Sequence, residues 1–369
     1  MTASNPQAPV ASQSRSNSVP TSKPVTETAD NMAKIERIRK VIRDDGNRWR
    51  QRFPILANNN VMGFTIWALS LTGIAVLAFG YIEGVISAWL VIPLVAILTS
   101  FLHELEHDLI HWQYFKNTKW MHNLMLLGVW VARPGTINPW IRRRLHFLHH
   151  KVSGSEGDLE ERGIGNGHNY GLMRFWIMMD TYTGNLIRAY KNLPAGHRAK
   201  ALIRITISNL PFGVITALTW YGFIGFHLIT GLAALAGMPI SWSSETLAFM
   251  DSVSTWVVVL VAPFYLRSFC LNFISSNMHY YGDVTSLMEQ TQVLNAPRFW
   301  PFQLFCFNFG STHGIHHFVV GEPFYIRQLT AKAAHKVMAE EGIRFNDLGT
   351  FSRTNRFQES EENVVSAAA

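Results

Sequence analysis

The sequence predicts an all-α integral membrane protein, with about four transmembrane helices in two hairpins and a cytosolic helical cap that holds a di-metal centre. Three observations predict this fold: apolar stretches long enough to cross a bilayer, basic residues confined to one side of them, and histidine clusters on that same side. Hydrophobic residues make up 48% of the 369 residues and charged residues only 15%, which is apolar for a soluble enzyme.

The chain begins with two segments that precede the apolar stretches. Residues 1–30 are dominated by Ser, Thr, Pro, Ala and Gln without a periodic apolar face, which predicts a disordered tail. Residues 31–54 predict a basic amphipathic helix with Ile35, Ile38 and Ile42 on one face, typical of a helix that lies on an anionic membrane surface. A membrane domain is expected over residues 55–325, followed by a cytosolic C-terminal tail, 326–369.

Four apolar stretches are long enough to span a bilayer, which takes roughly 20 residues. Residues 61–82 and 84–102 carry no charge and are separated by a short "EG" turn. The third stretch begins near Ile205 and can tilt, kink at Pro211 or continue along the interface, and the fourth begins near Ser252. The stretches "WMHNLMLLGVWVA" and "FWPFQLFCFNF" are too short to span and are expected to be interfacial or buried.

The distribution of basic residues predicts the orientation. The loops at 83–84 and about 238–251 contain no Lys or Arg, whereas the N-terminal segment, residues 103–204 and residues 279–369 hold nearly all of them. The positive-inside rule places these three segments and both termini in the cytoplasm, at the inner or plasma membrane if the protein is bacterial. The net charge of +7 therefore reflects topology, and no nucleic acid is expected as a partner.

Histidines form the most informative pattern, because four clusters fall on the predicted cytosolic side. Residues four apart on a helix share a face, and an HxxHH box points its three imidazoles in one direction. So many nitrogens exceed the four to six ligands of one metal and suit two. Imidazole binds iron, copper, zinc and nickel, and a redox-active pair that binds O2, preferably two irons, fits best. The clusters are "HELEHDLIH" with His103, His107 and His111; "HFLHH" with His146, His149 and His150; the isolated His279; and "HGIHH" with His313, His316 and His317.

Other polar residues near the clusters have two interpretations each. Glu104, Glu106 and Asp108 can orient histidine N–H groups or form a solvated helix face, and Asp158 and Asn277 are further candidates for contacts to the ligands. The run Arg142, Arg143 and Arg144 can bind a carboxylate or phosphate head group or anchor the chain at the membrane surface.

These boxes, their order and their position after the predicted spans resemble those of the membrane-bound fatty acid desaturase and hydroxylase superfamily, over roughly residues 55–325. The resemblance implies a non-haem di-iron centre, O2 as co-substrate and a fatty acid or acyl lipid as substrate. It favours a fatty acid desaturase; the same chemistry can also give an alkane or fatty acid hydroxylase or a 1-alkene-forming fatty acid decarboxylase. Electrons are expected from a separate ferredoxin or small haem protein with its reductase, because Cys270 and Cys306 alone cannot hold an iron–sulfur cluster.

Some alternatives stay open at this point. "HDLIH" with the following "WQYFKNTKW" resembles the desaturases and favours His107 and His111, whereas "HELEH" resembles the alkane hydroxylases and favours His103 and His107. Ser275 stands where acyl-CoA desaturases have Asn, so that Asn272 or Asn277 would have to substitute. A membrane metal transporter is a distant alternative. It needs ionisable groups inside the spans, and the predicted spans have almost none apart from Arg267 and His227.

Overall fold

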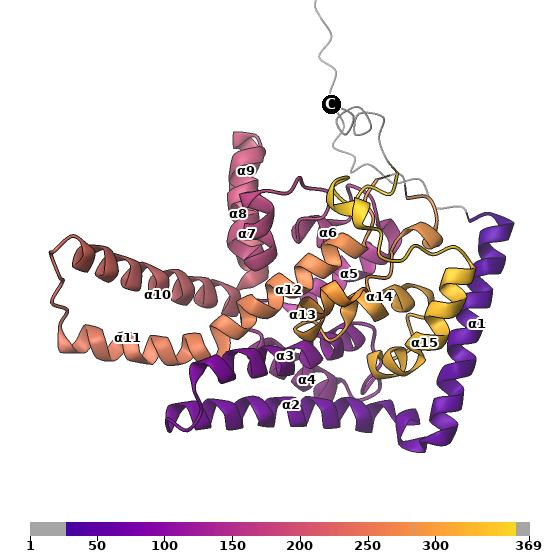
Figure 1. Cartoon of the computed structure of the whole chain (residues 1–369), viewed down its shortest axis with the longest axis horizontal. Helices are drawn as coiled ribbons and strands as arrows, with labels where there is room; N and C mark the ends of the chain where they lie inside the picture. The colour runs from indigo at the N-terminus through magenta and orange to yellow at the C-terminus, as the bar shows by residue number, and fades with distance from the viewer. Residues whose placement is uncertain (1–26, 283, 359–369) are drawn as a thin grey trace, which may run out of the picture.

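The computed structural model describes residues 27–282 and 284–358, which are helical and contain no β-strand beyond isolated bridges (Figure 1). The predicted tail therefore lies outside the described residues except for residues 27–30. The all-α prediction is confirmed, and four helices are long and apolar enough to cross a membrane. The longer helices besides those four are α1 (Ala29–Arg52), α4 (Lys119–Ala132), α5 (Pro139–Val152), α8 (Thr181–Asn192), α9 (Ala195–Asn209), α14 (Phe309–Phe318) and α15 (Phe324–Glu340).

The first hairpin consists of α2 (Asn59–Ile82) and α3 (Ala88–Ile110). The side chain of Asn58 caps α2 by accepting from the Val61 N–H, and Gly84 turns the chain with a φ of +70° that favours glycine. Helix α3 continues without a break from the apolar stretch into the first histidine cluster. The sequence predicted this continuity, and it fixes the direction in which those histidines point.

The second hairpin pairs α10 (Phe212–Leu235) with a continuous 35-residue helix, Ser244–Met278. This long helix comprises α11 (Ser244–Trp256), a π-helical turn η2 (Val257–Val261) and α12 (Ala262–Met278). At about 1.5 Å per residue it measures about 52 Å and exceeds a bilayer core of about 30 Å. Helix α9 ends before Pro211, so the third apolar stretch is two separate helices, as expected at a proline.

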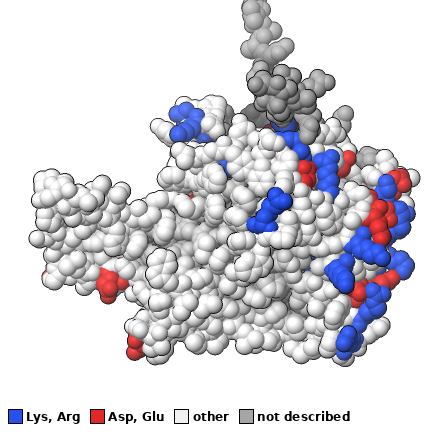
Figure 2. All heavy atoms as spheres, in the orientation of Figure 1, with Lys and Arg blue, Asp and Glu red and all other residues white. Residues whose placement is uncertain are grey.

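The spans share one direction in Figure 1, with both hairpin turns at the left and α1, α14 and α15 at the right. Charged side chains gather at that right end along α1, while the surface over the spans is almost free of them (Figure 2). This separation of charge is what a protein embedded in a bilayer requires. The structure therefore describes a membrane protein; which side faces the cytoplasm stays a prediction.

Helix α1 corrects one expectation. Ile35, Ile38 and Ile42 were assigned to a membrane surface, but they are buried in a cluster with side chains of α14 and α15. The amphipathic pattern is the same whether the apolar face meets lipid or protein, so the sequence could not separate the two. Helix α15 begins at Phe324 and packs along α1, and Glu341 after it pairs with Arg37. The first part of the predicted C-terminal tail thus belongs to the folded unit.

The remaining described helices form a cap around the ends of α3 and α12. The short stretch 120–132 is α4, which buries Met125, Leu126 and Val129 against the first hairpin. Helix α6 (Leu159–Gly163) follows α5 and brings a group of acidic side chains toward the histidines. Around α12, this cap is completed by α7 (Leu172–Met179), α13 (Trp300–Leu304) and α14.

Candidate metal centre

Four helix ends bring the histidine clusters together. His103 and His107 lie on the last turns of α3, and His111 is its C-terminal cap residue. His279 caps the C-terminus of α12. The two HxxHH boxes occupy α5 and α14, so that each helix turns its histidines toward the same space. Every one of these histidines is buried or half-buried.

The first nitrogen group consists of His107, His111, His146 and His316, whose ring nitrogens lie within 4.8 Å of one another. The Nε2 atoms of His111 and His146 are 2.9 Å apart. His150 adjoins this group, because its Nε2 lies 3.1 Å from that of His146 and 3.1 Å from that of His316. Three separate segments of the chain, the end of α3, α5 and α14, therefore supply nitrogens to one point.

The second nitrogen group consists of His149, His279, His313 and His317, again with ring nitrogens within 4.8 Å of one another. The Nε2 atoms of His279 and His317 are 3.3 Å apart. The two groups are neighbours, since His149 and His150 adjoin in the chain and the rings of His150 and His317 lie 5.3 Å apart. The arrangement fits the predicted pair of metal sites.

The spacing and the hydrogen bonds of these imidazoles fit metal binding. Two imidazole nitrogens that bind one ion at about 2.1 Å and at right angles are about 3 Å apart, close to the separations seen here. Both ring nitrogens of His107 are buried without a hydrogen-bond partner among the described residues, as are Nδ1 of His313 and of His316. Buried imidazoles without partners are costly, so a metal ion fits this space.

Protonation states agree with this conclusion for most of the histidines. Burial, followed by the charges of neighbouring histidines, lowers the pKa of His150. Burial, neighbouring histidines and the charge of Arg327 likewise lower the pKa of His313 and of His316. Burial lowers the pKa of His279 to about 3. These rings are therefore neutral, which is the form that binds metals. Burial disfavours protonation of His149 too, but Asp158, Glu160 and Glu161 outweigh it and raise its pKa to about 9.

His103 stands apart from both groups. Its Nδ1 accepts a hydrogen bond from Nη1 of Arg133 at 3.0 Å, and it belongs to neither nitrogen group. The first cluster thus contributes His107 and His111 to the first group, in agreement with the pattern "HDLIH". This leaves nine histidines around the two sites.

Acidic and amide side chains hold the outer nitrogen of several ligand rings. Asp158 accepts from Nδ1 of His149 at 2.8 Å, as its candidacy implied, and Glu160 accepts from Nδ1 of His146 at 2.8 Å. Such contacts fix the tautomer and direct Nε2 to the metal. Gln290 lies 2.9 Å from Nδ1 of His317 in the same way.

Around His279 the partners are Ser275 and Glu161. Nδ1 of His279 lies 3.0 Å from the Ser275 carbonyl oxygen and 3.4 Å from Oε1 of Glu161. The sequence analysis missed Glu160, Glu161 and Gln290. The acidic run "DLEE" eight residues after the second box was a usable signal for the two glutamates, but Gln290 has no local signal.

Arginines are the main partners of Glu104, Glu106 and Asp108. All three carboxylates are fully buried, so they form no solvated face; Oδ1 of Asp108 also lies 3.8 Å from Nδ1 of His107, whereas Glu104 and Glu106 pair with arginines alone. Arg327 bonds Glu104 and Asp108, while Glu106 pairs with Arg133 and Arg142. Burial explains the pairing, because an isolated buried carboxylate is costly.

Neither Asn272 nor Asn277 forms a hydrogen bond with the His279 ring. Asn277 accepts from the Tyr170 hydroxyl and donates to the Phe273 carbonyl, and Asn272 donates to the Met178 carbonyl. Asn272 lines the cavity beside the histidines, but its amide N–H is held by the Met178 carbonyl, and Asn277 is held by Tyr170 and Phe273. Ser275, on the same helix face as His279, takes the position beside the ring.

The arginine run has three different environments. Arg142 bonds Glu106 and Glu160, and Arg143 donates to the Leu109 carbonyl and covers the ring of Trp112. Arg144 is exposed. Binding of a substrate head group by this run stays a prediction; Arg142 and Arg143 already have partners within the protein.

A cavity of about 490 Å³ opens beside the nitrogen groups, between α3, α5, α9 and α12. His103, His107, His146, His149, His279 and His313 line it, together with the apolar side chains Leu145, Leu159, Ile205, Phe264 and Leu271. Its volume is typical of small-molecule sites, which are concave and mostly apolar. A chain-like apolar ligand can therefore reach the histidines.

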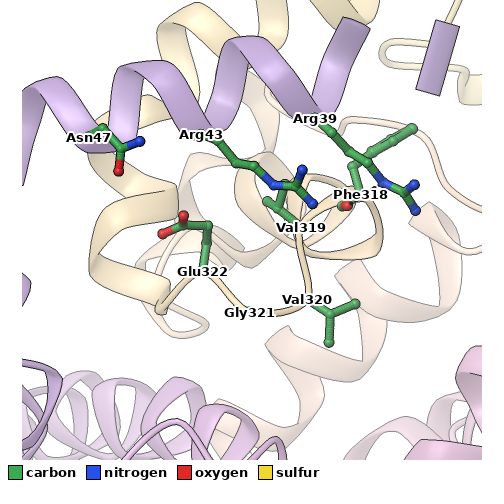
Figure 3. Close-up of a pocket in the computed structure, with 8 residues that line it drawn as sticks. All are labelled: Arg39, Arg43, Asn47, Phe318, Val319, Val320, Gly321 and Glu322. Carbon is green, nitrogen blue, oxygen red and sulfur yellow. Dashed lines mark hydrogen bonds between the residues drawn. The ribbon is translucent and has the colours of Figure 1, made fainter. Parts of the chain in front are cut away.

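A second, open cavity of about 510 Å³ lies between α1 and the segment Phe318–Glu322, away from the nitrogen groups (Figure 3). Arg39 and Arg43 of α1 point toward this segment, and Arg39 donates to the Phe318 carbonyl at 3.0 Å. This contact ties α1 to the end of α14 and so supports the third histidine box.

Comparison with known proteins adds one match. The sequence model of a family described as fatty acid desaturase matches residues 83–349, a range that includes every histidine of the two nitrogen groups. No curated protein matches the chain.

Proposed function

Because the chain belongs to the fatty acid desaturase family, we propose that it is an O2-dependent di-iron oxidoreductase that acts on the acyl chain of a fatty acid or acyl lipid, most plainly as a desaturase. The observation that supports this proposal is the convergence of nine histidines from four helix ends on two neighbouring points beside an apolar cavity. The bilayer around the spans is the natural source of such a chain.

In this proposal the protein's own residues orient the histidine rings toward the metals and form the wall that holds the acyl chain and excludes water. Asp158 and Glu160 hold the rings of His149 and His146, so that both Nε2 atoms stay directed at the metals. Leu271 and Phe264 line the apolar wall against which an acyl chain would lie. Bound iron would supply activation of O2 and removal of hydrogen from an unactivated C–H bond. The neutral imidazoles are ligands that suit iron.

The overall reaction balances with an external donor. Desaturation converts –CH2–CH2– to –CH=CH–, and the two hydrogen atoms removed combine with one O2, two electrons and two protons to give two waters. Hydroxylation would insert one oxygen atom and release one water, and decarboxylation would release CO2 and a 1-alkene. All three outcomes use the same oxidant and the same number of electrons, so the products must be identified directly.

The electron donor in this proposal is a separate protein, a ferredoxin or a small haem protein with its reductase. Cys270 and Cys306 are buried free thiols and too few for a cluster that needs four ligands. The iron-loaded chain should therefore not turn over with a nicotinamide cofactor alone. Turnover without any added protein would refute a separate donor.

The test is product analysis of cells that express the chain with a donor system and receive free fatty acids of graded length. New unsaturated acids identify a desaturase, hydroxy acids a hydroxylase, and a 1-alkene one carbon shorter a decarboxylase. His316→Ala should abolish every product, whereas His197→Ala, which changes an exposed histidine outside both groups, should not. Identical lipid profiles for the wild type and His316→Ala, with iron-loaded wild-type protein in the membrane, would contradict the proposal.

A further inference from the structure

Arg267 is a buried cation that faces the cavity. It lies on α12, its side chain is 1% exposed, and it lines the same cavity as His103, His146 and His279. A guanidinium stays charged under all ordinary conditions. Its charge must therefore be balanced within the protein or by something that enters the cavity.

The hydrogen bonds of Arg267 do not balance that charge. Nη2 donates to the Ser268 hydroxyl at 3.2 Å, and Nε and Nη1 are buried without a partner. No carboxylate within residues 27–282 and 284–358 forms an ion pair with it. Placing an unpaired charge in a low-dielectric environment is among the most costly arrangements in a protein.

The other fully buried arginines differ in this respect. Arg133 pairs with Glu106, and Arg327 pairs with Glu104 and Asp108. Arg174 donates to Asn355, to Ser276 and to the His168 carbonyl. Each of these three guanidiniums thus has a carboxylate or three neutral acceptors, whereas Arg267 has only the Ser268 hydroxyl.

The surroundings of Arg267 favour an anion. Arg133 and Arg142 line the same cavity, and burial followed by the positive charge of Arg267 lowers the pKa of Arg133. Glu106 and Glu160, the carboxylates nearest to them, are already bonded to Arg133, Arg142 and His146. A bound carboxylate would gain charge-assisted hydrogen bonds from a donor that lacks a partner.

We propose that Arg267 binds the carboxylate of a free fatty acid inside the cavity, with the head group inward beside the histidines. The apolar side chains Leu145, Ile205 and Leu271 line the rest of the cavity and suit the acyl chain. A thioester head group carries no charge at this position and would leave Arg267 unpaired. The inference rests on the proposed function, because it names the chemical form of the substrate of that site.

The mouth of the cavity offers a weaker alternative for the head group. Arg188 already donates to the Arg162 carbonyl and to His168. Arg204 lines the cavity but is exposed, so water competes for it. A head-inward acid places the carbon atoms next to the carboxylate beside the nitrogen groups, which favours oxidation near the carboxyl end over oxidation in mid-chain.

The experiment is equilibrium binding to the metal-loaded full chain in lipid nanodiscs, with dodecanoate, 1-dodecanol and dodecanoyl-CoA as probes. The wild type should bind dodecanoate at least tenfold more tightly than the alcohol. Arg267→Met should remove this preference while it leaves binding of the alcohol unchanged, and Arg267→Lys should keep part of it. Arg204→Met should keep the preference in full.

Three results would overturn the inference: no preference for the acid in the wild type, an unchanged preference in Arg267→Met, or its loss in Arg204→Met. The first of these needs no variant, so poor recovery of Arg267→Met leaves the inference testable. Ligand-free Arg267→Met should also unfold at a higher temperature than the wild type, because an unpaired buried charge is gone. Binding is measured without turnover; an acid preference in a chain that oxidises nothing would sink the proposed function alone.

Discussion

His103 and His107 lie one turn apart on α3, yet only His107 joins a nitrogen group. Both ring nitrogens of His107 lack a hydrogen-bond partner within the described residues, whereas Arg133 donates to His103. The difference arises because Arg133, which follows α4, reaches the cavity side of α3 above the metal sites. Spacing of four residues therefore selects three histidines here, of which two belong to a nitrogen group.

The metal content of variants can distinguish the roles of His103 and His107. His107→Ala should lower bound iron from about two ions per chain toward one or none, because a ligand of the first group is lost. His103→Ala should keep both ions. The measurement is elemental analysis of the purified proteins after equal iron loading, and equal loss from both variants would contradict the assignment.

Asp158 provides a second prediction at the level of single residues. Asp158→Asn removes the carboxylate that holds Nδ1 of His149, and the affinity for metal should fall about 10–100-fold. Competition with a chelator of known affinity measures this change. Asp44→Asn, an exposed change on α1, is the matched control; the same loss in both variants would show that the carboxylate at position 158 has no special part.

At the level of helices, α1 supports the histidine box "HGIHH" of α14 by packing against that helix. Its isoleucine face is buried with Ile315, Phe318 and Val319, which belong to α14 or follow it directly. This packing holds the end of α14, from which His316 and His317 project. Helix α1 is therefore part of the scaffold of the site although it contributes no ligand.

Ile38→Ala should destabilise the protein by about 2–5 kcal/mol, because Ile38 is fully buried and the change leaves a cavity. The effect is measured as the midpoint temperature of thermal unfolding in detergent and as the iron content. Both values should fall. Met32→Ala removes a side chain that is 57% exposed on the same helix and should change neither. Equal midpoints for the two variants would mean that α1 is not held by this face.

The helices and the site differ in how far the sequence could predict them. The spans were predicted because length and hydropathy are local properties, and the histidine boxes because their spacing is helical. The isoleucine face was assigned to lipid since periodicity does not reveal what covers it. Gln290 was missed because only tertiary packing brings it to His317.

At the scale of the whole molecule, charge is separated along the direction of the spans. The hairpin turns lie at one end, and α1 with its many ion pairs lies at the other (Figures 1 and 2). A bilayer around the uncharged middle leaves the nitrogen groups near the charged end. In the function proposed above, the lipid and a soluble electron donor would then approach the centre from different sides.

Cysteine labelling tests the orientation. Single cysteines at Glu83 or Ser243, in the hairpin turns, should react with a membrane-impermeant maleimide in intact cells. A cysteine at Ala33 on α1 should react only after the cells are opened. The native Cys270 and Cys306 are buried and provide a low background. Labelling of Ala33→Cys in intact cells would reverse the orientation.

The π-helical turn Val257–Val261 divides the longest helix into two parts with different tolerance to change. Helix α11 before it buries no side chain, whereas α12 after it buries nearly every one, Arg267 among them. One residue more or less within a helix rotates everything beyond it by about 100°. The outer half can absorb such a rotation because any apolar side chain meets lipid equally well. The π-helical turn thus separates the two halves. An insertion or deletion in the membrane-facing half need not change the direction in which the side chains of α12 point.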